Sequence, residues 1–245
     1  FDYKKIYLNY KNDFNRVFQQ ISSEGAFIMQ EELLKFEKKL SKYHGIKYVV
    51  GVGNATDAME LLLIADDVKN GSEILFCSHT MTATASAIKF AGAKPIPVNC
   101  NKDYLLDYKD LENKINSRTK GIFVTHLNGR IADMNEINSV AKKYNLKVYE
   151  DAAQAIGSKY HNKPAGSFGV GGCISFYPAK VLGCLGDGGA VVTNNKDIYK
   201  KVLLLRDHGR KKLNVKYWGF NSRLDNIQAG FLNFLIKDLK KKYQS

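Results

Sequence analysis

Several features that would define a protein class at once are missing from this sequence. The four cysteines form no C-x-x-C pair, which excludes zinc-knuckle and thioredoxin-type motifs. Cysteines so few and scattered are typical of reduced thiols and predict a cytoplasmic protein. The densest apolar run, residues 61–65, is far shorter than the ~18 residues of a membrane span, and no basic-then-apolar leader is visible. The sequence therefore predicts no membrane partner.

Acidic residues are also scarce, with 24 Asp and Glu against 37 Lys and Arg, which gives a formal charge of +13. Such a charge invites a nucleic-acid hypothesis. The basic residues occur in short clusters beside apolar helical positions, however, so we interpret them as solvated helix faces and predict no nucleic-acid partner. An anionic substrate could use some of these charges. With 44% hydrophobic residues, the 245-residue chain excludes disorder and can hold one large domain or two small ones.

Short apolar runs alternate with helical patterns along the chain. β-Branched and apolar runs of four to six residues are typical of strands buried on both faces. Strands alternating with helices imply parallel crossovers, so we predict an α/β fold with a mostly parallel open sheet flanked by helices. The predicted strands are 48–52, 73–76, 94–98, 120–125, 147–150, 173–176 and 189–193, and the predicted helices are 30–43, 56–65, 82–91, 108–116, 135–144, 196–206 and 224–242.

The predicted domain organisation is simple. Residues 1–30 are expected to form an N-terminal helical arm, and residues 31–245 one large α/β domain. The Gly-, Ser- and His-rich segment 158–172 is expected to be a loop between two strands.

A possible anion site follows the first strand of the sheet. Small residues in the stretch 51–58 allow a ligand to approach the backbone, and Thr56 can add a hydroxyl where the next helix begins. The glycine pattern is neither a Walker loop nor a complete dinucleotide fingerprint. An ordinary helix start with Asn54 as the N-cap explains the stretch equally well.

Two further polar groups follow strands. Asp151 stands at a strand end beside two alanines, where a carboxylate needs a cationic or N–H partner. Lys180 lies in an apolar, small-residue stretch, a setting that lowers lysine pKa values and favours Schiff-base chemistry. The alternatives are a turn cap for Asp151 and an exposed loop lysine for Lys180. Together with the anion site, the two residues match the phosphate, pyridine nitrogen and aldehyde of pyridoxal 5′-phosphate. No metal site is predicted.

Long motifs carry a resemblance to a known family. "EDAAQA" at 150–155, "SFYPAK" at 175–180 with "LGDGGAVVTN" at 185–194, and "GFNSRLDNIQA" at 219–229 resemble the DegT/DnrJ-type nucleotide-sugar aminotransferases. These are fold-type-I pyridoxal-phosphate enzymes, so the resemblance implies an aspartate-aminotransferase-like large domain. It also implies that the family's C-terminal small domain is missing or truncated in this chain.

The resemblance assigns roles to individual positions. Lys180 would bind the cofactor aldehyde and move protons, and Asp151 would pair with the pyridinium nitrogen. Gln154 would hydrogen-bond near the phenolic oxygen of the cofactor. A lysine in this position, where related dehydratases have histidine, favours transamination.

The remaining roles concern the phosphate and the ring face. Ala55, Thr56 and Ser175 would bind the phosphate, and Asn221 would reach the phosphate of a neighbouring subunit, which implies a homodimer with composite active sites. Met81 stands where the family often has an aromatic residue that stacks on the ring, and a thioether can cover the same face.

The resemblance implies transfer of an amino group, usually from glutamate, to a nucleotide-linked keto sugar in polysaccharide or glycan biosynthesis. Amination at the 3-position of a 6-deoxy sugar and amination at the 4-position both remain open. A truncated regulatory or non-catalytic relative that binds pyridoxal phosphate is the alternative. Further substrate-side candidates are His79, Arg130, His161, His208, Arg210 and Tyr217.

Overall fold

The computed structural model describes residues 1–243 of the chain, and the side chains of residues 1–239. The last two residues of the predicted domain 31–245 therefore lie outside the described range. Eight α-helices are found in this part of the chain: α1 (Tyr3–Ser23), α2 (Glu31–His44), α3 (Ala55–Ala65), α4 (Thr82–Phe90), α5 (Tyr108–Lys114), α6 (Met134–Lys143), α7 (Lys196–Leu205) and α8 (Asn226–Tyr243). Each predicted helix is present, with ends that differ by no more than two residues.

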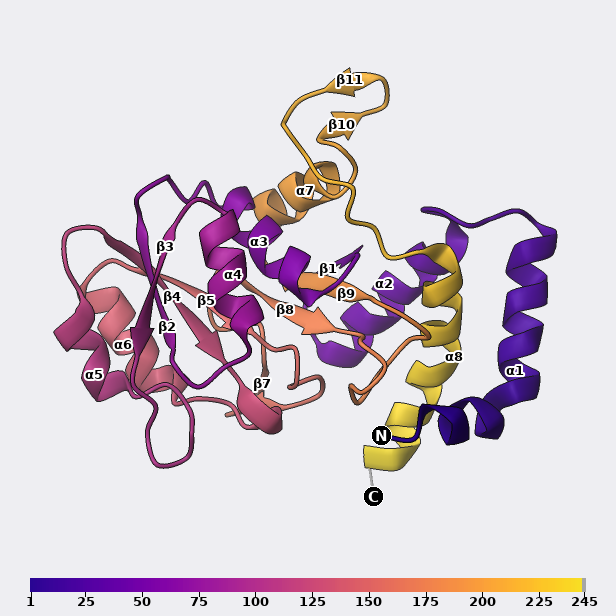
Figure 1. The fold of residues 1–245 in the computed structure, drawn as a ribbon, viewed down its shortest axis with the longest axis horizontal. Helices are drawn as coiled ribbons and strands as arrows, with labels where there is room; N and C mark the ends of the chain where they lie inside the picture. Colours follow the sequence, from indigo (N-terminus) through magenta and orange to yellow (C-terminus); the bar gives the residue numbers. More distant parts are fainter. Residues whose placement is uncertain (244–245) are drawn as a thin grey trace.

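A seven-stranded sheet forms the centre of the molecule (Figure 1). Its order is β1-β9-β8-β5-β4-β2-β3, formed by β1 (Tyr48–Val52), β2 (Glu73–Cys77), β3 (Lys94–Val98), β4 (Thr119–Thr125), β5 (Lys147–Asp151), β8 (Gly171–Ser175) and β9 (Gly189–Thr193). The pairs from β3 to β8 are parallel, and β9 runs antiparallel to both β1 and β8. The predicted mostly parallel open α/β sheet is confirmed.

Helices cover both faces of this sheet. One face packs against α3, α4 and α7, and the other against α2 and α8 at one end and α5 and α6 at the other. Helix α3 is apolar nearly all round because it lies between the sheet and its neighbouring helices, with Leu61, Leu62 and Leu63 all buried. Full cover of both faces explains why the strands are continuous apolar runs.

The N-terminal helix α1 lies beside α8 at one end of the molecule (Figure 1). The contact is aromatic: the Phe14 ring meets Phe231 edge-on at 5.3 Å, and Tyr10 meets Phe234 at 5.5 Å. The boundary of a separate arm at residue 30 stays a prediction.

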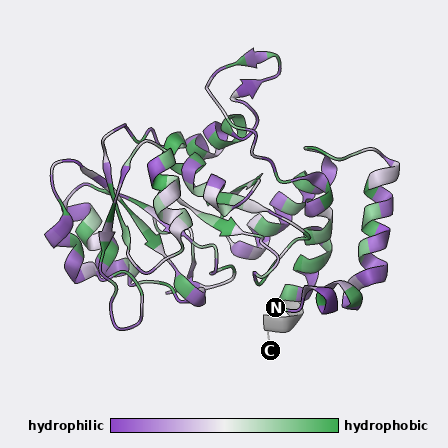
Figure 2. Cartoon of the chain, viewed as in Figure 1, coloured by the Kyte–Doolittle hydropathy of each residue, from purple (hydrophilic) through white to green (hydrophobic). Residues whose placement is uncertain are grey.

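Two short hairpins were not predicted. The segment 158–172 connects β5 to β8, as expected of a loop between two strands, but the prediction missed the hairpin of β6 (Lys159–Tyr160) and β7 (Lys163–Pro164) within it and the first two residues of β8 at its end. The second hairpin, β10 (Arg210–Lys211) with β11 (Asn214–Val215), projects from the body and is largely hydrophilic (Figure 2). Two-residue strands carry too little apolar patterning to be recognised in a sequence.

Candidate active site

A cavity of about 1090 Å³ opens at the carboxyl ends of the parallel strands, where ligands bind in open α/β sheets. Its walls come from the segments after β1, β2, β4, β5 and β8 and from the loop before β9. Seven of the eight predicted site residues line this one cavity: Ala55, Thr56, Met81, Asp151, Gln154, Ser175 and Lys180. Residues that are far apart in sequence are therefore gathered as the motifs predicted.

The first turn of α3 forms the anion-binding end of the cavity. The Asn54 side chain caps the helix by accepting a hydrogen bond from the Asp57 N–H at 2.9 Å. Within the described part of the chain the N–H groups of Ala55 and Thr56 have no partner, so they remain available to an anion. The sequence left two interpretations open, an Asn54 helix cap or an anion site. The structure shows that the same helix start can serve as both.

Gly189, the first residue of β9, packs directly against this helix start. A Cβ atom at Gly189 would lie 2.4 Å from the carbonyl carbon of Asn54 and 2.7 Å from the Ala55 nitrogen. Only a glycine permits this approach, so β9 fixes the position of the two free N–H groups.

The carboxylate of Asp151 is buried at the end of β5. Its Oδ2 accepts a hydrogen bond from the Thr84 hydroxyl at 2.9 Å, and its Oδ1 accepts one from the Ala153 N–H at 3.1 Å. Thr84 belongs in turn to a chain of hydroxyls that runs through Thr80 to Thr125. Two hydrogen bonds therefore fix the Asp151 carboxylate at the wall of the cavity. The bond from the Ala153 N–H is the turn cap that the sequence analysis gave as the alternative role of Asp151.

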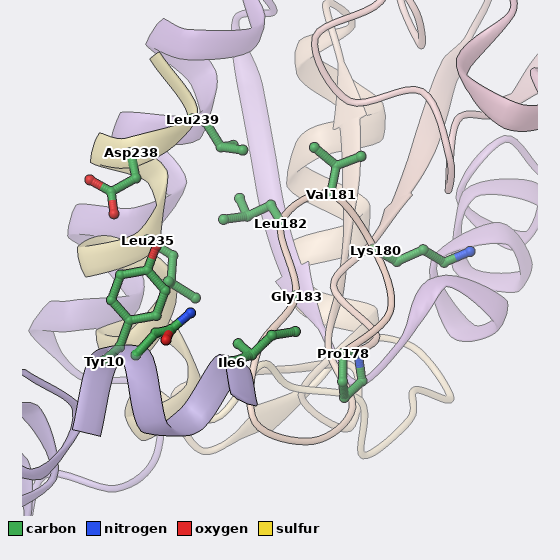
Figure 3. A pocket seen from close by; sticks show the side chains of 11 residues that line it. Ile6, Tyr10, Pro178, Lys180, Val181, Leu182, Gly183, Leu235, Asp238 and Leu239 are labelled. Atoms are coloured by element: carbon green, nitrogen blue, oxygen red, sulfur yellow. The ribbon is translucent and has the colours of Figure 1, made fainter. Parts of the chain in front are cut away.

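Lys180 reaches the same cavity from the loop that follows β8. Burial lowers the pKa of its amine, and the negative charge of Asp151 opposes this shift. The loop also borders a smaller cavity of about 200 Å³ between α1 and α8, which Ile6, Tyr10 and Leu235 line. In Figure 3 the Lys180 side chain points away from these three residues, which leaves its amine to the larger cavity.

Gln154 has a defined orientation. Its Oε1 accepts a hydrogen bond at 2.8 Å from the N–H of Asn128, a residue in the left-handed conformation with φ of 54°. Its amide Nε2 is therefore the end left to donate a hydrogen bond to a ligand in the cavity.

Three predicted positions need comment. Met81 lines the cavity and is 71% exposed, so its side chain is available to cover a ligand. Ser175 is buried, and its hydroxyl accepts a hydrogen bond from the Tyr177 N–H at 3.3 Å. Asn221 is exposed and does not line the cavity; its backbone pairs with Asp207 instead. Its role toward a second subunit stays a prediction.

Sequence reasoning missed several residues here. Thr84, Thr80 and Thr125 support Asp151, and the pair His126 and Glu150 lies beside it. One signal was available: Glu150 and Asp151 are adjacent at a strand end, where alternation of side chains directs one carboxylate into the interior and the other into the site.

None of the six further substrate-side candidates lines the cavity, and among the described residues no cluster suits a metal ion. None of the described helices is long and apolar enough to cross a membrane.

Comparison with known proteins places the chain in a family. The model of the DegT/DnrJ/EryC1/StrS aminotransferase family matches residues 9–244, so the chain belongs to this family. Among its relatives is the dTDP-3-amino-3,6-dideoxy-alpha-D-galactopyranose transaminase of Aneurinibacillus thermoaerophilus, which is 41% identical over 97% of this chain and 66% of the relative.

Solved structures agree with the family assignment. S. venezuelae DesV in complex with a ketimine intermediate superimposes with a TM-score of 0.94 and 34% identity, over 98% of this chain and 65% of that one. NtdA from Bacillus subtilis with bound cofactor PMP gives a TM-score of 0.89 and 33% identity, over 95% and 54%. The chain thus spans 54–66% of the length of these relatives.

Proposed function

We propose that this chain carries the cofactor site of a pyridoxal-phosphate-dependent sugar aminotransferase. The observation that carries the proposal is that the Lys180 amine, the Asp151 carboxylate and the free N–H groups of Ala55 and Thr56 line one cavity. Pyridoxal phosphate requires an amine for its aldehyde, a carboxylate for its pyridine nitrogen and an anion-binding helix start for its phosphate. The residues present therefore fit this cofactor. The family membership supports the same conclusion.

Each group has a task in this site. Ala55, Thr56 and Ser175 hold the phosphate, and Gln154 donates its amide N–H to the phenolic oxygen. Asp151, fixed by Thr84, keeps the pyridine nitrogen protonated. When bound, the cofactor supplies an electron sink that stabilises negative charge at the carbon next to the transferred nitrogen.

Lys180 moves the protons. Its lowered pKa leaves a larger fraction of the amine neutral and able to accept a proton. In the first half-reaction Nζ takes the proton from the α-carbon of the amino donor. In the second half-reaction the same amine returns a proton to the carbon of the sugar that receives the nitrogen.

The proposed substrates are glutamate as amino donor and a nucleotide-linked 3-keto-6-deoxy sugar as acceptor. The 3-amino-3,6-dideoxy product in the name of the Aneurinibacillus relative supports the 3-position over the 4-position. We place the reaction in surface polysaccharide biosynthesis, including lipopolysaccharide, in the cytoplasm. The active unit is proposed to be a homodimer, with Asn221 reaching the phosphate of the second subunit.

The direct test is an amino-transfer assay. Purified protein with pyridoxal phosphate and glutamate is incubated with a dTDP-linked 3-keto-6-deoxy sugar, and separately with the 4-keto isomer. We expect an aminated nucleotide sugar by mass spectrometry from the 3-keto substrate, and none from a Lys180→Ala variant. Cofactor binding without amination of either sugar would favour the non-catalytic alternative.

A further inference from the structure

A hydrogen-bonded pair with fully buried side chains borders the candidate active site, and His126 is also among the residues that line its cavity. His126 follows β4, and its Nε2 lies 2.9 Å from Oε2 of Glu150 in β5; neither side chain has any exposed surface. Successive residues of a strand point to opposite faces of a sheet. Glu150 therefore points away from the face on which its neighbour Asp151 meets Thr84.

Every polar atom of this pair has a partner. Besides His126, the Glu150 carboxylate accepts hydrogen bonds from the backbone N–H groups of Gly166 at 2.5 Å, Phe168 at 2.6 Å and Gly169 at 3.2 Å. His126 Nδ1 accepts from the Ala132 N–H at 3.4 Å, which assigns the ring proton to Nε2 as a donor to Glu150. The interior thus holds a carboxylate matched by four donors, which is the condition for burying such a group.

The pair is connected to two residues of the cavity. The backbone N–H of His126 donates to the carbonyl oxygen of Asp151 at 3.0 Å. Two residues further on, the N–H of Asn128 donates to Gln154 Oε1 at 2.8 Å. The segment 126–128 therefore contacts both Asp151 and Gln154, and the Glu150 carboxylate anchors this segment to the interior.

We propose that Glu150 and His126 are positioning residues, which fix Asp151 and Gln154 against the cofactor ring by holding segment 126–128 in one arrangement. The inference rests on the proposed function. Glu150 already serves stability, because an apolar residue there would leave the N–H groups of Gly166, Phe168 and Gly169 without an acceptor. The His126 side chain is what joins this buried carboxylate to segment 126–128. Sites that must hold a ligand in one geometry gain from a supporting layer of satisfied hydrogen bonds.

The test compares three variants with the parent by titration with pyridoxal phosphate. His126→Leu removes the donor to Glu150, whereas His126→Gln retains an amide N–H at a similar reach. We expect the dissociation constant to rise on the order of tenfold in His126→Leu, with a displaced absorbance maximum of the bound cofactor, and to stay within about threefold of the parent in His126→Gln. Tyr149→Phe is the matched control, since it removes one partly buried hydrogen bond of the same strand, the 2.8 Å bond to Asp66. Its binding and spectrum should equal those of the parent.

The outcomes separate the proposals. A His126→Leu protein that binds with the parental constant and absorbance maximum overturns the positioning role, as does a Tyr149→Phe protein that is impaired to the same degree. A parent that does not bind pyridoxal phosphate overturns the proposed function, and this inference with it. If His126→Leu melts below the assay temperature, Glu150→Gln takes its place, because it puts an amide group opposite N–H donors; the same weakening and spectral shift are expected, and parental values would overturn the role.

Discussion

The Thr84 hydroxyl on α4 donates a hydrogen bond to Oδ2 of Asp151 at the end of β5, 67 residues away in the sequence. Thr84 has no exposed surface and Asp151 is only 6% exposed. A hydrogen bond to a charged group is about twice as strong as one between neutral groups, and this one fixes the carboxylate on the cavity side of the sheet. The orientation of the Asp151 carboxylate thus depends on α4, which packs beside the sheet.

This contact gives the first prediction. Thr84→Val keeps the shape of the side chain and removes the donor, so Asp151 is left with the Ala153 N–H as its partner. We expect the amino-transfer rate to fall about tenfold, which corresponds to about 1.4 kcal/mol. Steady-state kinetics would check this, with Thr84→Ser as the control that keeps the hydroxyl. A Thr84→Val rate equal to that of the parent would contradict the role given to this bond.

The second prediction concerns the pH dependence of stability at Lys180. Burial lowers the pKa of Lys180 in the folded protein below its unfolded value, so the folded state binds fewer protons than the unfolded state between the two values. The charged Lys180 amine therefore destabilises the fold. This destabilisation is fully present below the pKa of the folded state and disappears as the pH rises through the pKa of the unfolded state. In the absence of cofactor, Lys180→Met should therefore unfold at higher urea concentration than the parent at pH ~7, with the charge-related part of this gain lost near pH ~11. The exposed Lys102→Met is the control, and a gain independent of pH would refute the explanation.

The third prediction tests how β9 fixes the anion site. Gly189→Ala places a Cβ atom 2.4 Å from the carbonyl carbon of Asn54, so the start of α3 must move. We expect a loss of about 1–3 kcal/mol in unfolding free energy, and weaker binding of pyridoxal phosphate than this loss alone would cause. Gly171→Ala is the matched control, because its Cβ would lie 2.7 Å from the Val192 carbonyl oxygen in the same sheet and would meet α3 at Leu62 (3.2 Å) rather than at the first turn of the helix. Equal effects of both variants on cofactor affinity would argue against a specific role of Gly189.

The fourth prediction concerns a buried ion pair that joins α2 to the residue directly after α7. Arg206 Nη1 lies 2.6 Å from Glu37 Oε1 and 2.9 Å from the Gly51 carbonyl oxygen, and both side chains are almost fully buried. Glu37→Leu leaves the guanidinium without its carboxylate and should cost about 3–5 kcal/mol of unfolding free energy. The double variant Glu37→Leu with Arg206→Met should recover part of this loss in urea denaturation, because it removes the unpaired charge but still leaves the buried N–H and carbonyl groups of Gly51 without these side-chain partners. A double variant less stable than Glu37→Leu would contradict this interpretation.

Much of the fold follows from local patterns in the sequence. The strand at 48–52 and the helix beginning at 82 are visible because the spacing of their apolar residues agrees with their final burial. The antiparallel direction of β9 is not visible, because residues such as Val191 and Val192 are buried on both faces in either orientation. Direction depends on the path of the loop before β9, which holds Lys180 and has no repeating pattern.

The candidate site divides in a similar way. Lys180, Asp151 and Thr56 could be identified because each follows a strand in a small-residue context, and the cavity brings them together. Thr84 and His126 could not be identified from the sequence: Thr84 is one threonine of a helix, and His126 is 24 positions away from Glu150, its partner. Their importance arises from tertiary contacts, which no local spacing encodes.

The most direct test of the account is the absorbance spectrum of the purified protein mixed with pyridoxal phosphate, recorded beside a Lys180→Ala variant. Condensation of the cofactor aldehyde with a lysine amine produces a visible band that the free mixture lacks. The account predicts this band in the parent and its absence in Lys180→Ala. No band in the parent, or the same band in both proteins, would contradict the assignment of Lys180 as the cofactor lysine.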